Sequence, residues 1–271
     1  MHRTAYILLL LTALRWGVAL AVLSVVGRSH LQADRTIVRA HLPYLLAMGS
    51  LGLTLFNVCL YTALNFTTAI NASILQAAIP MVVFAINFLV FGIRATWAQL
   101  AGFVITVAGI VLIASRGSLE NLRAMNINLG DALMIIAVVS YGSYTVALRK
   151  MPKLHWQSMM VAMSTGAFVT AIAFAALEFA VGLGQWPDAR AWTVVIYTAI
   201  FPSILAQTFY VVGNRLIGGN RAGLFINLVP VFGTLLSVLI LAERFHAHHA
   251  IALALVFGGI WLAERFHRMS A

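Results

Sequence analysis

Residues 72–94 read ASILQAAIPMVVFAINFLVFGIR, and residues 222–244 read AGLFINLVPVFGTLLSVLILAER. Each copy has a small polar entry, a proline about nine residues into an apolar run, and a second run that ends in a charged residue. Because proline removes a backbone hydrogen bond and loosens the turn before it, Pro80 and Pro230 are the expected helix breaks. A two-helix unit that occurs twice in lipid is typical of transporters. The copies lie 150 positions apart and share Ala72/Ala222, Pro80/Pro230, Leu89/Leu239 and Arg94/Arg244.

Composition places most of the chain in lipid. Apolar residues make up 62% and charged residues 9% of the 271 positions, whereas soluble domains have roughly 25% charged residues. A water-soluble domain of this size could not hide so much apolar side chain. We therefore expect an all-α, polytopic bundle of transmembrane helices, because a helix satisfies its own backbone groups in lipid.

Polar breaks divide the chain into nine apolar segments, each a candidate membrane span. Two of the breaks are residues 28–41 and residues 213–221. The nine expected spans are residues 6–26, 42–63, 68–91, 97–114, 129–148, 159–183, 192–212, 222–241 and 250–263.

Lys and Arg in the short loops predict the orientation. When the C-terminus and the alternate loops are placed on one side, that side collects eleven of these residues and the other side five. The positive-inside rule then places the C-terminus in the cytoplasm. The net charge of +10 mainly reflects these loop residues, which set the topology and attract the protein to anionic lipid head groups. No nucleic-acid partner is expected, because no basic domain lies outside the spans.

Four short stretches carry a resemblance to a known family. They are residues 227–232 (NLVPVF), residues 60–73 (LYTALNFTTAINAS), residues 128–134 (NLGDALM, with Ser140, Tyr141 and Tyr144) and residues 14–16 (LRW). They resemble, in this order, the second-repeat signature, the third-to-fourth helix junction, the opening of the sixth helix and the second helix of EamA-type transporters. This family is a branch of the drug/metabolite transporter superfamily, and the likeness covers nearly the whole chain.

The resemblance implies ten helices in two inverted five-helix repeats, with both termini in the cytoplasm. The chain matches helices two to ten, so we expect that the first helix is missing, through a late start of the reading frame or a truncation. Residues 1–124 form the first predicted domain, with helices two to five, and residues 125–271 form the second, with helices six to ten. Ile93 stands where the family usually has an acidic residue, whereas Glu243 keeps that residue in the second repeat.

Amides and phenols inside the spans are the candidate substrate-binding groups. An unpaired polar group in lipid costs about 1–3 kcal/mol, so such side chains favour the bundle interior. The alternative is that several of them only join helices through interhelical hydrogen bonds. We expect one central cavity lined by Asn57, Tyr61, Asn71, Gln76, Tyr141, Tyr144, Gln207, Tyr210 and Asn227.

Three ionisable residues lie at or near membrane depth. Arg15 is a buried charge about ten residues into its span, so it should face a carboxylate, carbonyl groups or water. Asp131 lies in the first turn of its helix and is expected to be a structural cap. Glu178 is either the partner of Arg15 or an interfacial residue. With so few buried acids, proton coupling has weak support.

No cofactor and no metal site is expected. His246, His248 and His249 occupy one short loop without a nearby cysteine, which is a weak metal signal. Cys59, the only cysteine, lies inside a span, so no disulfide within the chain is possible. Residues 213–219 lack the preceding strand and the Lys-Ser/Thr of a phosphate loop, so they are interpreted as a helix end.

Two classes of function are compared. The favoured one is a multi-pass carrier of the inner cell membrane that exports small metabolites or drugs, amino-acid-like or amphipathic. An intramembrane enzyme would need a clustered nucleophile, base or metal ligands, and the spans contain no GxSxG, HExxH or paired aspartates. If the first helix is absent in the cell, a non-transporting membrane protein is a further alternative. The expected partners are a small-molecule substrate and the lipid bilayer, and a homodimer is compatible with the sequence.

Overall fold

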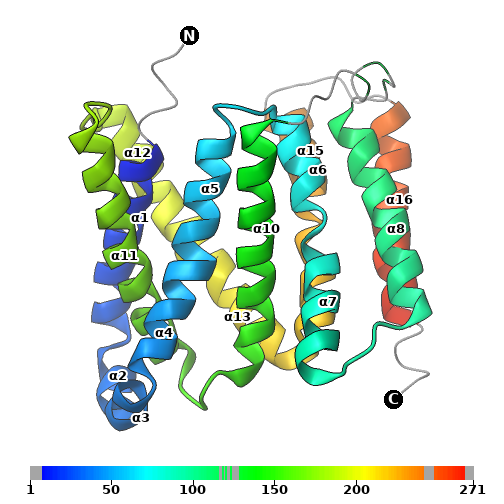
Figure 1. Cartoon of the computed structure of the whole chain (residues 1–271). Coiled ribbons are helices and arrows are strands. Elements are labelled where there is room, and N and C mark those ends of the chain that lie inside the picture. Colours follow the sequence, from blue (N-terminus) through cyan, green and yellow to red (C-terminus); the bar gives the residue numbers. More distant parts are fainter. Residues whose placement is uncertain are drawn as a thin grey trace. The chain divides into compact units, whose positions relative to one another are not determined.

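The part of the chain that the structure describes is mainly helical. The computed structural model describes residues 8–115, 118, 120, 123, 128–240 and 247–265 (Figure 1). These residues form helices and contain no β-strand. The all-α fold that the composition predicts is therefore confirmed.

Helices occupy the places where spans are expected. Trp97–Leu112 and Ala247–Ala263 are shorter apolar helices. The segment expected at residues 222–241 is helical as α14 (Gly219–Ile226) and α15 (Val229–Ile240). Its last residue, and residue 6 at the start of the first expected span, lie outside the described residues. The helices long and apolar enough to cross a membrane are Leu9–Val26, Leu42–Ala63, Ala72–Phe91, Leu129–Lys150, Trp156–Ala180 and Ala189–Ile217.

Two of the expected breaks differ from the structure. Residues 28–41 form two short helices, α2 (Arg28–Ala33) and α3 (Arg35–Ala40). The expected break at residues 213–221 is reduced to Gly218, whose φ of 81° favours glycine. The interpretation of residues 213–219 as a helix end is wrong at its start, because α13 (Gln207–Ile217) continues through Gly213. A glycine inside a helix costs only about 1 kcal/mol relative to alanine.

The offset of 150 residues in the sequence recurs in the helices. The π-helical segment η2 (Gly49–Leu55) has a counterpart in η4 (Ala199–Ala206). The starts of these elements agree to within one residue at this offset, which confirms that the chain contains one structural unit twice. The other matched elements are α5 (Phe56–Ala63) with α13, α6 (Ala69–Gln76) with α14, α7 (Ile79–Phe91) with α15, and α8 (Trp97–Ala114) with α16 (Ala247–Arg265).

The chain folds into two compact units, and each unit takes segments from both predicted domains. Unit 1 comprises Met1–Thr62 and Ala147–Leu216, and unit 2 comprises Ala63–Val146 and Ile217–Ala271. Unit 1 contains α1 (Leu8–Val26), α2, α3, α4 (Leu42–Met48), η2, α5, η3 (Leu148–Lys150), α11 (Trp156–Ala180), α12 (Ala189–Thr198), η4 and α13. Unit 2 contains α6, α7, α8, α10 (Leu129–Ala147), α14, α15 and α16.

Small residues bring the helices of unit 1 close together. Helix α11 packs against α1 and against the series formed by α4 and η2. The Met163 carbonyl lies so close to Gly49 that a Cβ atom there would overlap it. The Thr54 hydroxyl donates to the Ala167 carbonyl at 2.7 Å. Small residues and interhelical hydrogen bonds are the usual contacts between helices in lipid, where no hydrophobic force draws helices together.

Unit 2 contains the two copies of the proline-containing helix pair. The pair α6–α7 and the pair α14–α15 run in opposite directions (Figure 1), as expected for inverted copies. Helix α14 packs against α7, and a Cβ atom at Gly223 would lie 3.7 Å from the Cα atom of Pro80. Helix α8 pairs with α16 through Gly102 and Gly259. Between these elements lies a buried core of Ala77, Ile110, Val231, Val256 and Ile260.

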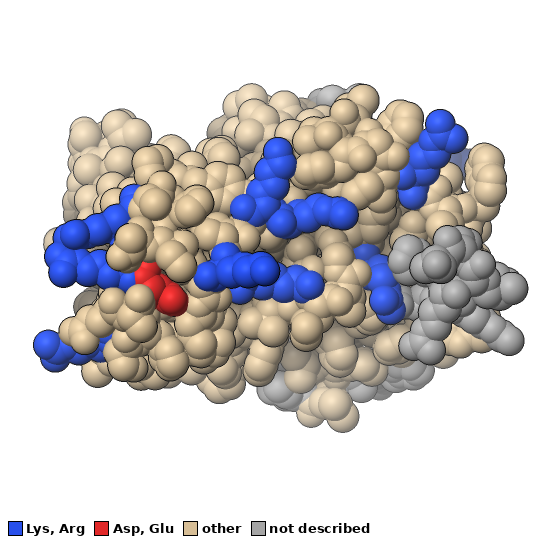
Figure 2. Space-filling model, turned by 90° about the horizontal axis from the view of Figure 1, so that it is seen from below, with Lys and Arg blue, Asp and Glu red and all other residues tan. Residues whose placement is uncertain are grey.

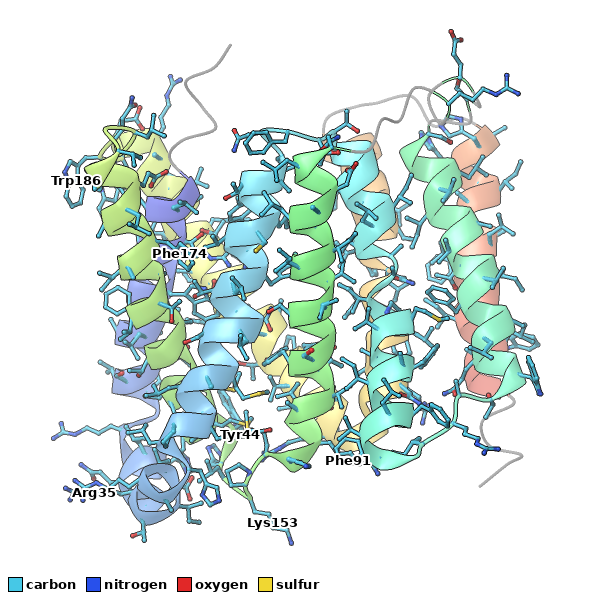
Figure 3. The ribbon with its side chains drawn as sticks, in the orientation of Figure 1. Arg35, Tyr44, Phe91, Lys153, Phe174 and Trp186 are labelled. Carbon is cyan, nitrogen blue, oxygen red and sulfur yellow. The ribbon has the colours of Figure 1, made fainter. Side chains whose placement is uncertain are left out.

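One end of unit 1 is strongly basic. Lys and Arg side chains gather on the face seen in Figure 2, with little acidic surface among them. Figure 3 places Arg35 and Lys153 at this end of the unit and Trp186 at the opposite end. The exposed basic residues of unit 1 on α2, α3, η3, α13 and the loop before α11 are Arg28, Arg35, Arg39, Arg149, Lys150, Lys153 and Arg215.

Candidate functional site

The buried charge of unit 1 is Arg15. It lies within the span Leu9–Val26, and only 6% of its surface is exposed. Its Nη1 atom donates to the Tyr61 hydroxyl of α5 at 3.2 Å, and its Cζ atom lies 5.6 Å from the ring centre of Trp16. The Nε atom is buried and meets no hydrogen-bond acceptor among the described residues. Arg15 therefore joins α1 to α5 through neutral groups.

Glu178 accepts a hydrogen bond from the first turn of α1 and, among the described atoms, does not pair with Arg15. Its side chain is 5% exposed, and its Oε2 atom accepts a hydrogen bond from the Leu10 backbone N–H at 2.9 Å. The first N–H groups of a helix have no partner within the helix, and the helix dipole favours a negative charge there. Glu178 satisfies one of these groups and, among the described atoms, forms no ion pair with Arg15.

Asn57 and Tyr61 lie one turn apart on α5 and are both half-buried. The Asn57 Nδ2 atom donates to the Leu53 carbonyl at 2.6 Å. In η2 the Phe56 N–H bonds the Leu51 carbonyl, so the hydrogen-bond ladder is shifted by one residue from that of an α-helix. The Asn57 amide supports the carboxyl end of this π-helical segment.

Gln207 and Tyr210 follow the second π-helical segment and are also half-buried. Pro202 lies inside η4 and has no N–H to donate, and the Ser203 hydroxyl donates to the Thr198 carbonyl at 2.9 Å. The Gln207 Oε1 atom is buried and meets no donor among the described residues. Asn57, Tyr61, Gln207 and Tyr210 thus all belong to unit 1 and follow its two π-helical segments.

The remaining candidates belong to unit 2. Tyr141 and Tyr144 of α10 are buried, with ring centres 5.4 Å apart. Gln76 is half-buried at the end of α6, and Asn71 lies in the same helix. Pro80 is buried at the second position of α7, and Pro230 has the same position in α15.

Asn227 and an unexpected asparagine pair lie around α14. Asn227 is 2% exposed, and its Nδ2 atom meets no acceptor among the described residues. Asn87 of α7 donates through Nδ2 to the Oδ1 atom of Asn220 in α14 at 2.6 Å. Sequence reasoning did not single out Asn220, because it precedes the expected span and no spacing rule connects it with Asn87. The bond joins the two inverted copies at α7 and α14.

Asp131 caps α10, as the sequence predicts. Its Oδ2 atom accepts a hydrogen bond from the Asn128 N–H at 3.0 Å, and Asn128 Oδ1 accepts one from the Asp131 N–H at 3.2 Å. The Thr67 hydroxyl donates to Asp131 Oδ1 at 2.7 Å. Asp131 therefore stabilises the start of a helix.

Asp34 lies outside the spans and connects the basic end of unit 1 to α11. The His155 N–H donates to Asp34 Oδ2 at 2.9 Å, and the His155 ring stacks on His30 with ring centres 3.6 Å apart. The Ser158 hydroxyl interacts with the same carboxylate but lacks regular hydrogen-bond geometry. The His155 N–H is therefore the better-defined hydrogen-bond donor to Asp34. The Ser158 hydroxyl, then the His155 N–H and the two imidazoles, lower the pKa of Asp34.

The described residues contain no group of three or more His, Cys, Asp or Glu side chains that could hold a metal ion. His248 and His249 contact each other edge to face, with ring centres 4.1 Å apart, and His246 lies outside the described residues. The candidate groups are amides, phenols and one guanidinium. Such groups can bind and orient a polar molecule through hydrogen bonds.

Comparisons with known proteins agree with this architecture. The chain is 26% identical over 219 residues to "Uncharacterized transporter YetK" of Bacillus subtilis (strain 168), a match that covers 80% of this chain and 66% of that relative. It is 30% identical over 213 residues to an "Uncharacterized transporter" of Archaeoglobus fulgidus, covering 78% of this chain and 72% of the relative. A solved crystal structure shares the fold with a TM-score of 0.76 at 22% identity, over 96% of this chain and 89% of that one.

The family assignment rests on a match along almost the entire chain. The model that describes the EamA-like transporter family matches residues 4–115 and 128–264. Both stretches contain one copy of the repeated helix pair, as the sequence resemblance implies. A match to a family of transporters also decides between a carrier and an intramembrane enzyme in favour of the carrier. The chain belongs to the EamA-like transporter family.

Proposed function

We propose that this chain exports small metabolites or drugs, amino-acid-like or amphipathic, across the inner cell membrane. The observation that supports this most directly is the pair of π-helical segments in unit 1, η2 and η4, at matching positions of the two repeats. Segments of this kind occur often at functional sites, because they break the regular ladder and redirect the following side chains.

The residues that follow these segments supply the binding groups. Asn57 and Tyr61 follow η2, and Gln207 and Tyr210 follow η4. All four are half-buried, which suits side chains that meet a polar solute. The buried Gln207 Oε1 atom, which meets no donor among the described residues, supports this assignment, since an acceptor without a donor costs about 1–3 kcal/mol.

The basic end of unit 1 supports a cytoplasmic C-terminus. Its exposed Lys and Arg residues all fall in the set of eleven that the positive-inside rule places in the cytoplasm. A phosphatase reporter fused to the C-terminus should therefore be inactive and a fluorescent cytoplasmic reporter active. An active phosphatase fusion would contradict the orientation.

Efflux from loaded cells tests the function. Cells that express the chain and are loaded with labelled amino acids or toxic amphipathic amines should lose at least one compound faster than vector controls. Tyr61→Ala and Tyr210→Ala should each slow this efflux about tenfold, because one lost hydrogen bond of about 1.4 kcal/mol corresponds to a factor of ten.

Tyr197→Ala is the matched control for these variants. Tyr197 lies on α12 with 59% of its surface exposed, so its removal should leave efflux unchanged. Membrane levels of all three variants are measured by immunoblotting. If Tyr61→Ala and Tyr210→Ala export normally, or if their losses follow their membrane levels, the two tyrosines are packing residues and the proposal fails at this site.

A further inference from the structure

Arg15 is a cation inside a membrane span, and the described residues provide it with no counter-ion. Only 6% of its surface is exposed, so little of the side chain is open to solvent. A charged side chain near the middle of a span is costly unless it pairs with an opposite charge or reaches water. A buried charge that lacks a compensating partner strongly destabilises a protein.

The described groups around Arg15 supply no negative charge. The Tyr61 hydroxyl accepts one hydrogen bond from Nη1 at 3.2 Å, and the Trp16 ring offers only a cation–π contact at 5.6 Å. The buried carboxylate of unit 1, Glu178, already accepts the Leu10 N–H at 2.9 Å and forms no ion pair with Arg15 among the described atoms.

Two neighbouring donors remain unsatisfied at this place in α1. The Arg15 Nε atom and the Trp16 Nε1 atom are both buried without a hydrogen-bond acceptor in the part of the chain that the structure describes. Both atoms can only donate. Among the described residues these two donors have no acceptor and the guanidinium meets no negative charge, and a bound anion would supply both.

We propose that Arg15 binds the carboxylate group of the molecule that this protein transports. The inference rests on the proposed export function and assigns its substrate class: small molecules with one carboxylate and an apolar or amino-acid-like body. The planar guanidinium matches a carboxylate through two parallel N–H···O bonds. Tyr61, which is half-buried and bonded to Arg15, connects the guanidinium to the polar face of α5 that also presents Asn57.

Paired compounds that differ only in the carboxylate test this assignment. The probes are benzoate with benzamide and L-phenylalanine with L-phenylalaninamide, and inorganic phosphate serves as a second anion. Binding to the purified chain in detergent micelles is measured by the shift of its thermal unfolding temperature and by isothermal titration. At millimolar concentration the carboxylates should raise the unfolding temperature, whereas the two amides and phosphate should not.

Variants of two arginines separate binding from folding. Arg15→Gln should abolish the preference for carboxylates, and Arg15→Lys should weaken carboxylate binding about tenfold, because lysine cannot form the bidentate pair. Arg215→Gln is the matched control, since this guanidinium donates to the Leu154 and Pro152 carbonyls at 3.2 and 2.6 Å. It should keep the preference for carboxylates.

Each outcome has one meaning. If no carboxylate binds, if the amides bind equally well, or if Arg15→Gln keeps the preference, the inference is wrong. Where Arg15→Gln does not reach the membrane, the Arg15→Lys titration alone decides. Efflux of neutral or cationic probes without carboxylate preference would overturn only this inference, whereas carboxylate binding without efflux of any probe would overturn only the proposed export.

Discussion

Alanine at Gly259 should weaken unit 2, while alanine at the adjacent Gly258 should not. A Cβ atom at Gly259 would lie 2.5 Å from the Gly102 carbonyl oxygen and 2.9 Å from the Thr106 backbone nitrogen, both in α8. Backbone atoms cannot rotate away, so α8 and α16 would have to separate. A Cβ atom at Gly258 would have no heavy atom within 4 Å.

Overpacking and helix propensity act in opposite directions in Gly259→Ala. Overpacking costs about 1–3 kcal/mol, and contact with backbone places Gly259→Ala near the upper value. Alanine gains up to about 1 kcal/mol over glycine in a helix, so the net loss for Gly259→Ala is about 2 kcal/mol. Gly258→Ala keeps only the gain. The two variants should therefore differ by about 3 kcal/mol in the free energy of unfolding.

Unfolding by SDS in mixed micelles, followed by circular dichroism, measures this difference. The neighbouring position controls for expression, detergent and helix propensity. Equal free energies of unfolding for the two variants would show that α8 and α16 do not meet at Gly102 and Gly259, and the packing of unit 2 would need revision.

Two further predictions concern carboxylates of unit 1. Because its folded pKa is lowered, Asp34 stabilises the fold at pH values above its unfolded pKa of about 3.9, and this contribution is lost as the pH falls through the lower folded value. Asp34→Asn should remove this acid-dependent part of the unfolding free energy, measured from pH 6 downward, and an unchanged pH profile would contradict the contact with His155. Glu178→Leu should cost about 1–3 kcal/mol, because the Leu10 N–H becomes a buried donor without an acceptor. Glu178→Gln keeps a carbonyl acceptor and should unfold close to the wild type, and equal losses in both variants would argue against the hydrogen bond.

Composition and the repeated proline-containing stretch predict the helical fold and the inverted pairs. Pro80 and Pro230 lack the N–H that would bond the Gln76 and Ile226 carbonyls, and α6 and α14 end at those residues. Gly213 misleads because glycine alone does not end a helix; the chain ends the helix only at Gly218, where φ is positive.

The polar contacts are less predictable than the helices. Residue type and depth indicate that Arg15 and Glu178 are buried, and opposite charges suggest a pair. The structure instead uses Glu178 at the first turn of α1, which depends on how α1 and α11 pack and not on spacing in the sequence. The π-helical segments are equally hidden, although Pro202 is one signal for η4.

The repeat is symmetric in its backbone and asymmetric in its chemistry. At the offset of 150 residues, η2 corresponds to η4 and Asn57 corresponds to Gln207, so both copies place an amide after a π-helical segment. Arg15, however, corresponds to Thr165, which donates to the Val161 carbonyl of its own helix at 2.9 Å. A duplicated backbone gives the two copies equivalent helices, which is the usual basis for alternating access. Because Thr165 stands at the position of Arg15 in the second copy, the proposed carboxylate site exists in one copy, so a carboxylate-bearing substrate would bind in one orientation, with its charged end toward α1.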